Sequence, residues 1–313
     1  MHGVQRPKTV TPRHPSEIEE ERVRLQEYQL LNKSLLERNH RKEFEEDDSF
    51  DLSTALLTLN PEHVTAWSFR RKCLISMIKS NEVNHHEIIL EKLNDEMKFT
   101  FKSFENHPKC YSIWEHRKWI LKQMKSQDWF NELNLVESLL KKDGRNFHAW
   151  GYRRFLISMI SSQDDQLSSQ ERFKSELNFT TKQIESNFSN FSAWHYRSRL
   201  LESQFLGSKT DEKEIRLKEE FEWVRNALWI DPNDQSGWLY HRWLMSHNDR
   251  DDVREAEIAS IKELLELEPD SKWALATLLQ YCPNEVDVLN KLVELDPLRK
   301  ERYLDVAKGL VKV

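Results

Sequence analysis

The sequence predicts an all-α fold: a crescent-shaped α-α superhelix, which is a solenoid of antiparallel helix-pair repeats. Glycine occurs only 6 times in 313 residues, whereas tight turns and β-hairpins depend on residues that tolerate positive φ. Charged residues make up 32% of the chain, as is typical of amphipathic helices. Tryptophan occurs 11 times and recurs in similar segments, 47 residues apart from Trp67 to Trp114 and 35 apart from Trp238 to Trp273. Spacings of this size are typical of stacked helical repeats.

Each repeat contains a loop segment that leads into an anchor tryptophan. The segments are residues 60–71, 107–118, 143–154, 187–198 and 231–242, with a degenerate sixth at 268–275. The anchors are Trp67, Trp114, Trp150, Trp194, Trp238 and Trp273. One helix pair cannot bury its apolar face alone, so neighbouring units must stack. We therefore predict about six repeats in a single domain over residues 16–313.

The order within a unit is a first helix, a short loop and a second helix. Five prolines follow apolar runs: Pro61, Pro108, Pro232, Pro269 and Pro297. Proline lacks an N–H group and disfavours helix at the residue before it, so the first helix should end there. The second helix should begin near the tryptophan, with N-cap candidates Thr65, Ser112, Ser192 and Ser236. Polar stretches such as 161–170 connect the repeats.

An arginine follows four anchors at a distance of three residues: Arg70, Arg117, Arg153 and Arg197. In the fifth unit, Trp238 is followed by His241 and Arg242. Residues three apart share one helix face, so the indole should fill the space between helices. The guanidinium should bond to carbonyls or carboxylates at the end of the preceding helix, where the dipole is negative. We interpret these residues as structural, since four catalytic sites in one chain are implausible.

The same counts exclude several functions. The glycines are too far apart for a P-loop or a dinucleotide-binding motif. We expect no transmembrane segment and no secretory signal, because no long apolar run occurs. Three widely separated cysteines make neither a disulfide framework nor a metal cluster, which favours a cytoplasmic location. A formal net charge of −6 argues against nucleic-acid binding.

The pattern N/D-P-x-x-x-x-x-W-x-x-R on helix pairs resembles the alpha-subunit repeat of protein prenyltransferases. Two stretches, NFSNFSAWHYRS (187–198) and DPNDQSGWLYHRWL (231–244), are similar to the alpha subunits of Rab geranylgeranyltransferases, also called geranylgeranyltransferase type II. The MHG start is similar as well. The resemblance covers residues from about 50 to 280, and its motifs are specific because five repeats keep their register.

The resemblance implies a heterodimeric enzyme that is active only with a barrel-shaped beta subunit. It would transfer geranylgeranyl from geranylgeranyl diphosphate to C-terminal cysteines of Rab GTPases presented by Rab escort protein. The zinc and the isoprenoid pocket would belong to the beta subunit. Two alternatives stay open: the alpha subunit of farnesyltransferase and type I geranylgeranyltransferase, or a non-catalytic helical-repeat scaffold that binds proteins.

The resemblance also implies site residues. The family's K-x-Y motif of the second repeat matches Lys109 and Tyr111, and its lysine contacts the isoprenoid diphosphate. Tyr111 either lines the substrate channel or supports the helix pair. A histidine of the third repeat faces the same region and matches His148, beside Asn146. The positions five and three before each anchor vary most between units, and loops on rigid scaffolds often carry function.

Two features near the N-terminus have open roles. Residues 1–15 are predicted to form an extended arm, because Pro7, Pro12 and Pro15 lie in it. His2 is a candidate transient ligand of the partner's zinc, since imidazole is a common zinc ligand. The acidic run at 43–48 is interpreted as a solvated helix end, with contact to a basic partner surface as the alternative.

Overall fold

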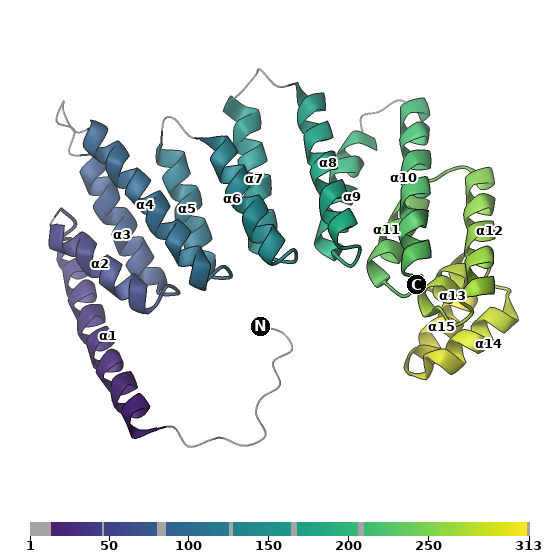
Figure 1. The fold of residues 1–313 in the computed structure, drawn as a ribbon, viewed down its shortest axis with the longest axis horizontal. Coiled ribbons are helices and arrows are strands. Elements are labelled where there is room, and N and C mark those ends of the chain that lie inside the picture. The colour runs from purple at the N-terminus through teal and green to yellow at the C-terminus, as the bar shows by residue number, and fades with distance from the viewer. Residues whose placement is uncertain are drawn as a thin grey trace. The chain divides into compact units, whose positions relative to one another are not determined.

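The computed structural model describes residues 14–45, 47–79, 86–124, 128–163, 168–205 and 210–311. Within these ranges the chain forms α-helices, one 3-10 turn and short loops, and no strand (Figure 1). The helices are α1 (Pro15–Arg41), α2 (Asp47–Leu59), α3 (Val64–Lys79), α4 (His86–Asn106), α5 (Tyr111–Gln123), α6 (Trp129–Lys142), α7 (Phe147–Gln163), α8 (Ser169–Ser186), α9 (Phe191–Phe205), α10 (Thr210–Ile230), α11 (Gln235–Ser246), α12 (Asp251–Leu267), α13 (Lys272–Tyr281), α14 (Val286–Leu295) and α15 (Lys300–Ala307). The prediction of an all-α fold is confirmed.

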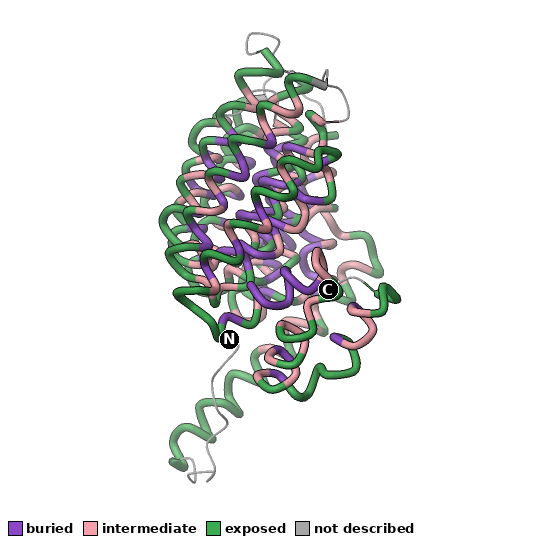
Figure 2. Tube along the Cα trace, turned by 90° about the vertical axis from the view of Figure 1, so that its right-hand side faces the viewer, coloured by how far each residue is buried: buried purple, intermediate pink, exposed green. Residues whose placement is uncertain are grey.

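The helices divide into two compact units. The first contains α1–α5, the start of α6 and residues Gly151–Arg153, and the second contains the rest of α6 and α7 together with α8–α15. In the first unit α2 packs on α3 and α4 on α5; in the second α8 packs on α9, α10 on α11 and α12 on α13. Buried residues lie where the helices of a unit face one another, and exposed residues lie on the outer sides of the helices (Figure 2). Sequential helix pairs are therefore present, whereas a single domain over 16–313 stays a prediction.

In the four repeats for which the sequence predicted an N-cap, the residue before the second helix lies two positions earlier than the predicted cap. The Asn146 and Asn190 amide oxygens accept from backbone N–H groups of α7 and α9, and the Asp234 carboxylate accepts from the Ser236 N–H. The N-cap candidates Ser112, Ser192 and Ser236 are instead the second residues of their helices. The prediction was wrong because serine tolerates the first turn as well as the cap, so residue type alone did not fix the boundary.

The first five anchor tryptophans are buried to the same depth, each 2% exposed or less. Each indole N–H donates to the carbonyl six residues earlier, as from Trp67 to Pro61 at 2.7 Å and from Trp194 to Phe188 at 2.7 Å. The sixth unit differs: α13 begins at Lys272, so Leu275 takes the fourth helical position that the anchors hold elsewhere. Trp273 is half-buried and lies two residues out of register.

A buried arginine–glutamate pair joins successive repeats. Arg197 donates through Nε and Nη2 to the Glu220 carboxylate on α10, at 2.7 Å each. Its Nη1 donates to the Leu177 carbonyl at 3.2 Å, in the middle of α8. Two further pairs follow this pattern, Arg70 with Glu96 and Arg117 with Glu132. We expected the guanidinium at the end of the preceding helix, and this was wrong. The arginine lies one turn after the anchor, so it meets the antiparallel first helix well before that helix ends.

Each of these glutamates, and also Glu176 in the fourth repeat, takes a hydrogen bond from the residue two positions after its own repeat's anchor. The hydroxyls of Tyr152, Tyr196 and Tyr240 donate to Glu132, Glu176 and Glu220. In the second repeat this position is His116, whose Nε2 lies 2.8 Å from Glu96. The buried His116 Nδ1 has no hydrogen-bond partner among the described residues. A neutral ring that donates from Nε2 fits both observations.

We expect the substitution His116→Tyr to reduce the loss of stability on acidification. Burial lowers the pKa of His116 below its usual 6.5, so the unfolded chain takes up this proton first as the pH falls. The contribution of the neutral His116 to the free energy of unfolding is complete above about pH 6.5. Below that pH it is lost, at up to about 1.4 kcal/mol per pH unit. Urea unfolding at pH 7.5 and 5.5 measures it. The exposed His195→Tyr is the matched control, and equal losses in His116→Tyr and wild type would contradict the prediction.

Candidate functional site

The loops that join the two helices of a repeat lie at one end of the helix pairs within each unit (Figure 1). Bonds between neighbouring loops hold them in place. The Cys110 thiol donates to the Pro61 carbonyl at 3.2 Å, and the Ser271 hydroxyl donates to the Pro232 carbonyl at 2.8 Å. The tryptophan indoles donate to the same loops. These loops are therefore a fixed platform for the side chains that they expose.

Each unit exposes large apolar side chains at this end. The first residue of the second helix is apolar and exposed in four repeats: Val64 (66%), Tyr111 (65%), Phe147 (58%) and Phe191 (46%). These are the positions three before the anchors, which the sequence marked as variable. Aligned exposed apolar side chains are typical of protein-interaction sites. The loop end of each unit is thus a candidate contact surface.

Lys109 and Tyr111 lie together on the loop between α4 and α5. Lys109 is exposed in the turn, and Tyr111 begins α5. The buried Cys110 separates them, and its N–H bonds to the His107 carbonyl at 3.1 Å. The backbone therefore places both side chains at the loop end, where a cation and an aromatic ring are exposed.

His148 is the second residue of α7 and belongs to the second unit, whereas Lys109 and Tyr111 belong to the first. It is 8% exposed, and its backbone N–H bonds to the Asn146 Oδ1 at 3.0 Å. The rings of Phe147 and His148 lie with centroids 4.0 Å apart. Asn146 is thus the N-cap of α7, and His148 is more enclosed than a solvent-facing side chain.

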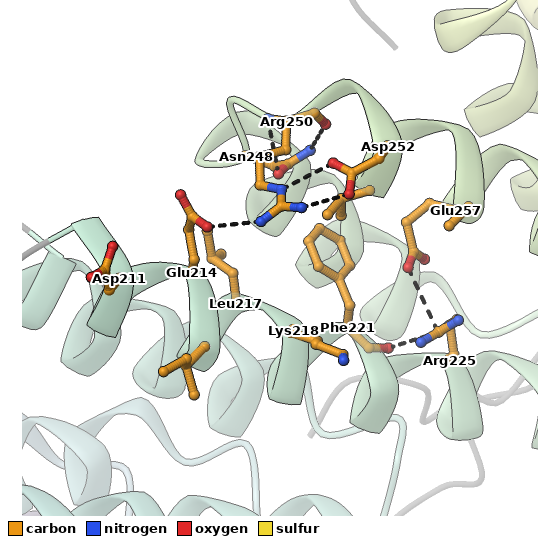
Figure 3. Close-up of a pocket in the computed structure, with 13 residues that line it drawn as sticks. Asp211, Glu214, Leu217, Lys218, Phe221, Arg225, Asn248, Arg250, Asp252 and Glu257 are labelled. Carbon is orange, nitrogen blue, oxygen red and sulfur yellow. Dashed lines mark hydrogen bonds and ion pairs between the residues drawn. The ribbon is translucent and has the colours of Figure 1, made fainter.

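A cavity of about 480 Å³ lies between α10, α12 and the loop before α12 (Figure 3). Its floor includes the buried Leu217 and Phe221. At its rim, Arg250 donates to Glu214 at 2.9 Å and to both oxygens of Asp252, at 2.9 and 2.6 Å. These bonds hold the pKa of the Asp252 carboxyl below its usual value. Arg250 thus pairs with both carboxylates of the rim, and the apolar floor beneath offers a place for an apolar group.

Sequence reasoning did not find this cavity. Glu214 and Arg250 are 36 positions apart and belong to no common motif. Their pairing depends on how α10 packs beside the start of α12, which a single sequence does not show.

The predicted N-terminal arm lies mostly outside the described residues, whereas most of the acidic run lies within them. His2 and residues 1–13 of the predicted arm lie outside the described residues, and Pro15 is the first residue of α1. In the acidic run, the Ser76 hydroxyl donates to Glu45 at 3.0 Å, and Glu43 lies 3.7 Å from Arg41. Asp48 is 86% exposed. Part of the run therefore bonds within the chain.

The chain was compared with known proteins. Residues 46–77, 93–124, 129–160, 173–204 and 217–248, about half of the chain, match the protein prenyltransferase alpha subunit repeat. The geranylgeranyl transferase type-2 alpha subunit of Dictyostelium discoideum is 34% identical, over 97% of this chain and 98% of that protein. The Schizosaccharomyces pombe protein of that name is 32% identical, over 97% and 96%. The pig protein is 34% identical, over 81% of this chain and 43% of its own length.

A solved structure has the same fold. It is Candida albicans protein geranylgeranyltransferase-I complexed with GGPP, with a TM-score of 0.68 over 99% of this chain and 96% of that chain, at 21% identity. The chain belongs to the protein prenyltransferase alpha subunit family. Within it, the relatives that match over nearly the full length are alpha subunits of the type-2 geranylgeranyl transferase. Among the described helices, none has the length and apolar character needed to cross a bilayer.

Proposed function

We propose that this chain is the alpha subunit of a heterodimeric Rab geranylgeranyltransferase. With a beta subunit, it transfers geranylgeranyl from geranylgeranyl diphosphate to C-terminal cysteines of Rab GTPases presented by Rab escort protein, in the cytoplasm. The observation that carries the proposal is the sequence identity of 34% and 32%, over nearly the full length, with type-2 alpha subunits from two organisms. The repeat match over five units supports it.

The loop ends of the two units are the surfaces that we assign to the beta subunit and the substrate. They present fixed loops, exposed apolar side chains and the Lys109–Tyr111 pair. In the transfer, the C–O bond of the isoprenoid diphosphate breaks, its electron pair leaves with the diphosphate, and the cysteine sulfur forms the new C–S bond while its proton is lost. We assign Lys109 to the diphosphate and Tyr111 to the substrate channel. His148 is the third candidate, held by the first turn of α7.

We assign the zinc of this enzyme to the beta subunit. A zinc site takes three or four ligating side chains, and no group of three His, Cys, Asp or Glu side chains lies together in the part of this chain that the structure describes. Bound zinc would lower the pKa of the substrate thiol. His2 stays a candidate transient ligand, which a kinetic comparison of the heterodimer with and without residues 1–10 tests.

A substrate comparison tests the proposed function. The chain is co-expressed with a type-2 beta subunit, and prenyl transfer is measured with a Rab–escort complex and with a CaaX peptide. We expect turnover of the Rab–escort complex and little of the peptide. The converse preference would assign the chain to the farnesyl and type I group. No transfer to either substrate by an assembled heterodimer would favour the non-catalytic scaffold.

A further inference from the structure

A cavity of about 390 Å³ lies between α11, α13 and α15 in the second unit. Four cationic side chains line it: Arg242, Lys272, Arg299 and Arg302. The single carboxylate of the lining, Asp296, accepts from Arg299 at 2.5 Å and from the Tyr303 hydroxyl at 2.9 Å. The lining thus carries four cationic side chains and one carboxylate, in a chain whose formal net charge is −6. The cavity is thus a concentrated positive site on an acidic protein.

Arg242 is the half-buried cation of this set. The preceding residue, His241, takes the helical position that arginine holds in other repeats and bonds to Glu257 at 3.1 Å. Arg242 lies one position further along α11, outside the arginine–glutamate pattern, and in the described ranges no carboxylate pairs with its guanidinium. Burial, together with the like charge of Arg302 and against the effect of Tyr281, lowers its pKa. A guanidinium placed so is stabilised by an anion that reaches it from outside.

The cavity adjoins the buried core of the C-terminal helices on one side and the loop end on the other. Ala276 and Tyr303 line it and also belong to a buried cluster with Leu279 and Val306. Gln235 and Leu239 line it together with a second hollow of about 430 Å³, which includes Arg145 and Phe191. A chain that covers the exposed Phe191 can therefore extend into the basic cavity without crossing another element.

We propose that this cavity receives a carboxylate-bearing segment of the partner subunit. The inference rests on the proposed function, because it needs a partner on the loop end of the second unit. A partner carboxylate would bond to the Arg242 guanidinium in the two-pronged geometry that suits this pair, with Lys272 as a second charge. Charge complementarity and continuity with the apolar loop surface favour a protein segment over a free phosphate group.

Zero-length cross-linking of the assembled heterodimer tests the proposal. A water-soluble carbodiimide joins an amine to a carboxylate with which it is in contact, so we expect Lys272 to be linked to an aspartate or glutamate of the partner. The double variant Arg242→Glu, Arg302→Glu should raise the Kd of the heterodimer about 30-fold or more, with a weaker salt dependence. Arg216→Glu, at an arginine on α10 whose side chain is 38% exposed, is the matched control and should leave the Kd near that of wild type.

The outcomes separate this inference from the proposed function. An unchanged Kd in the double variant, with Lys272 linked only to its own chain, would overturn the inference while assembly and activity of the wild type uphold the function. Protection of Lys272 by millimolar inorganic phosphate in the heterodimer would show an open small-anion site and would also overturn it. Failure of the wild-type chain to assemble with a beta subunit would instead refute the proposed function.

Discussion

Replacing Lys109 by alanine in the assembled heterodimer should lower the rate of prenyl transfer about 10²–10³-fold. Negative charge builds on the diphosphate as the C–O bond breaks, and a fixed ammonium stabilises that charge in a site from which water is excluded. The loop supports this role, because the indole of Trp114 bonds to the Pro108 carbonyl at 2.9 Å, beside Lys109. Single-turnover measurement with a Rab–escort complex isolates the chemical step.

The control for this variant is Lys102→Ala, which removes an exposed lysine from α4 and should leave the rate unchanged. Both variants should form the heterodimer with the wild-type Kd, since neither side chain is buried. Lys109→Arg should recover part of the lost rate, because the positive charge stays. A rate for Lys109→Ala equal to that of wild type would contradict the assignment and favour the scaffold hypothesis.

Replacing Arg197 by leucine should lower the free energy of unfolding by about 3–5 kcal/mol. Arg197 is 6% exposed and Glu220 is 1% exposed, so the variant leaves a buried carboxylate that is still bonded to the Tyr240 hydroxyl but has lost its guanidinium. Removing one member of a buried pair costs more than removing both, because the remaining charge is uncompensated. Urea unfolding followed by circular dichroism measures the change.

Two further variants make this test specific. Arg199→Leu removes an exposed arginine two residues away, whose ion pair with Glu202 lies at the surface, and should change stability by less than about 1 kcal/mol. The double variant Arg197→Leu, Glu220→Leu should be more stable than Arg197→Leu alone. If the double variant is less stable than the single one, the pair does not act as the structure indicates.

Periodicity was the part of the fold that the sequence predicted well. A proline lies six residues before the anchor tryptophan in three repeats, and both residue types act locally, so helix pairs and loops followed from them. The register of the sixth repeat was predicted wrongly. The prediction aligned Trp273 with the other anchors, whereas α13 places Leu275 at the buried anchor position. A leucine at that position carries no signal above the background of a helix core.

The candidate site was harder to predict from the sequence than the fold. Physical chemistry alone does not separate Lys109 from any solvated lysine, and the family resemblance supplied that choice. The exposed residues at the start of each second helix were visible as variable positions, but their exposure depends on the helix boundary. Both charged cavities were missed, since residues such as Arg242 and Asp296 meet only through the packing of α11 with the C-terminal helices.

The central claim, that this chain works as one half of a prenyltransferase, is tested most directly by its native partner. The chain is purified from its source under mild conditions, and the co-purifying proteins are identified by mass. We expect a prenyltransferase beta subunit in a one-to-one ratio. Purification of the chain with other proteins and no such subunit would contradict the claim.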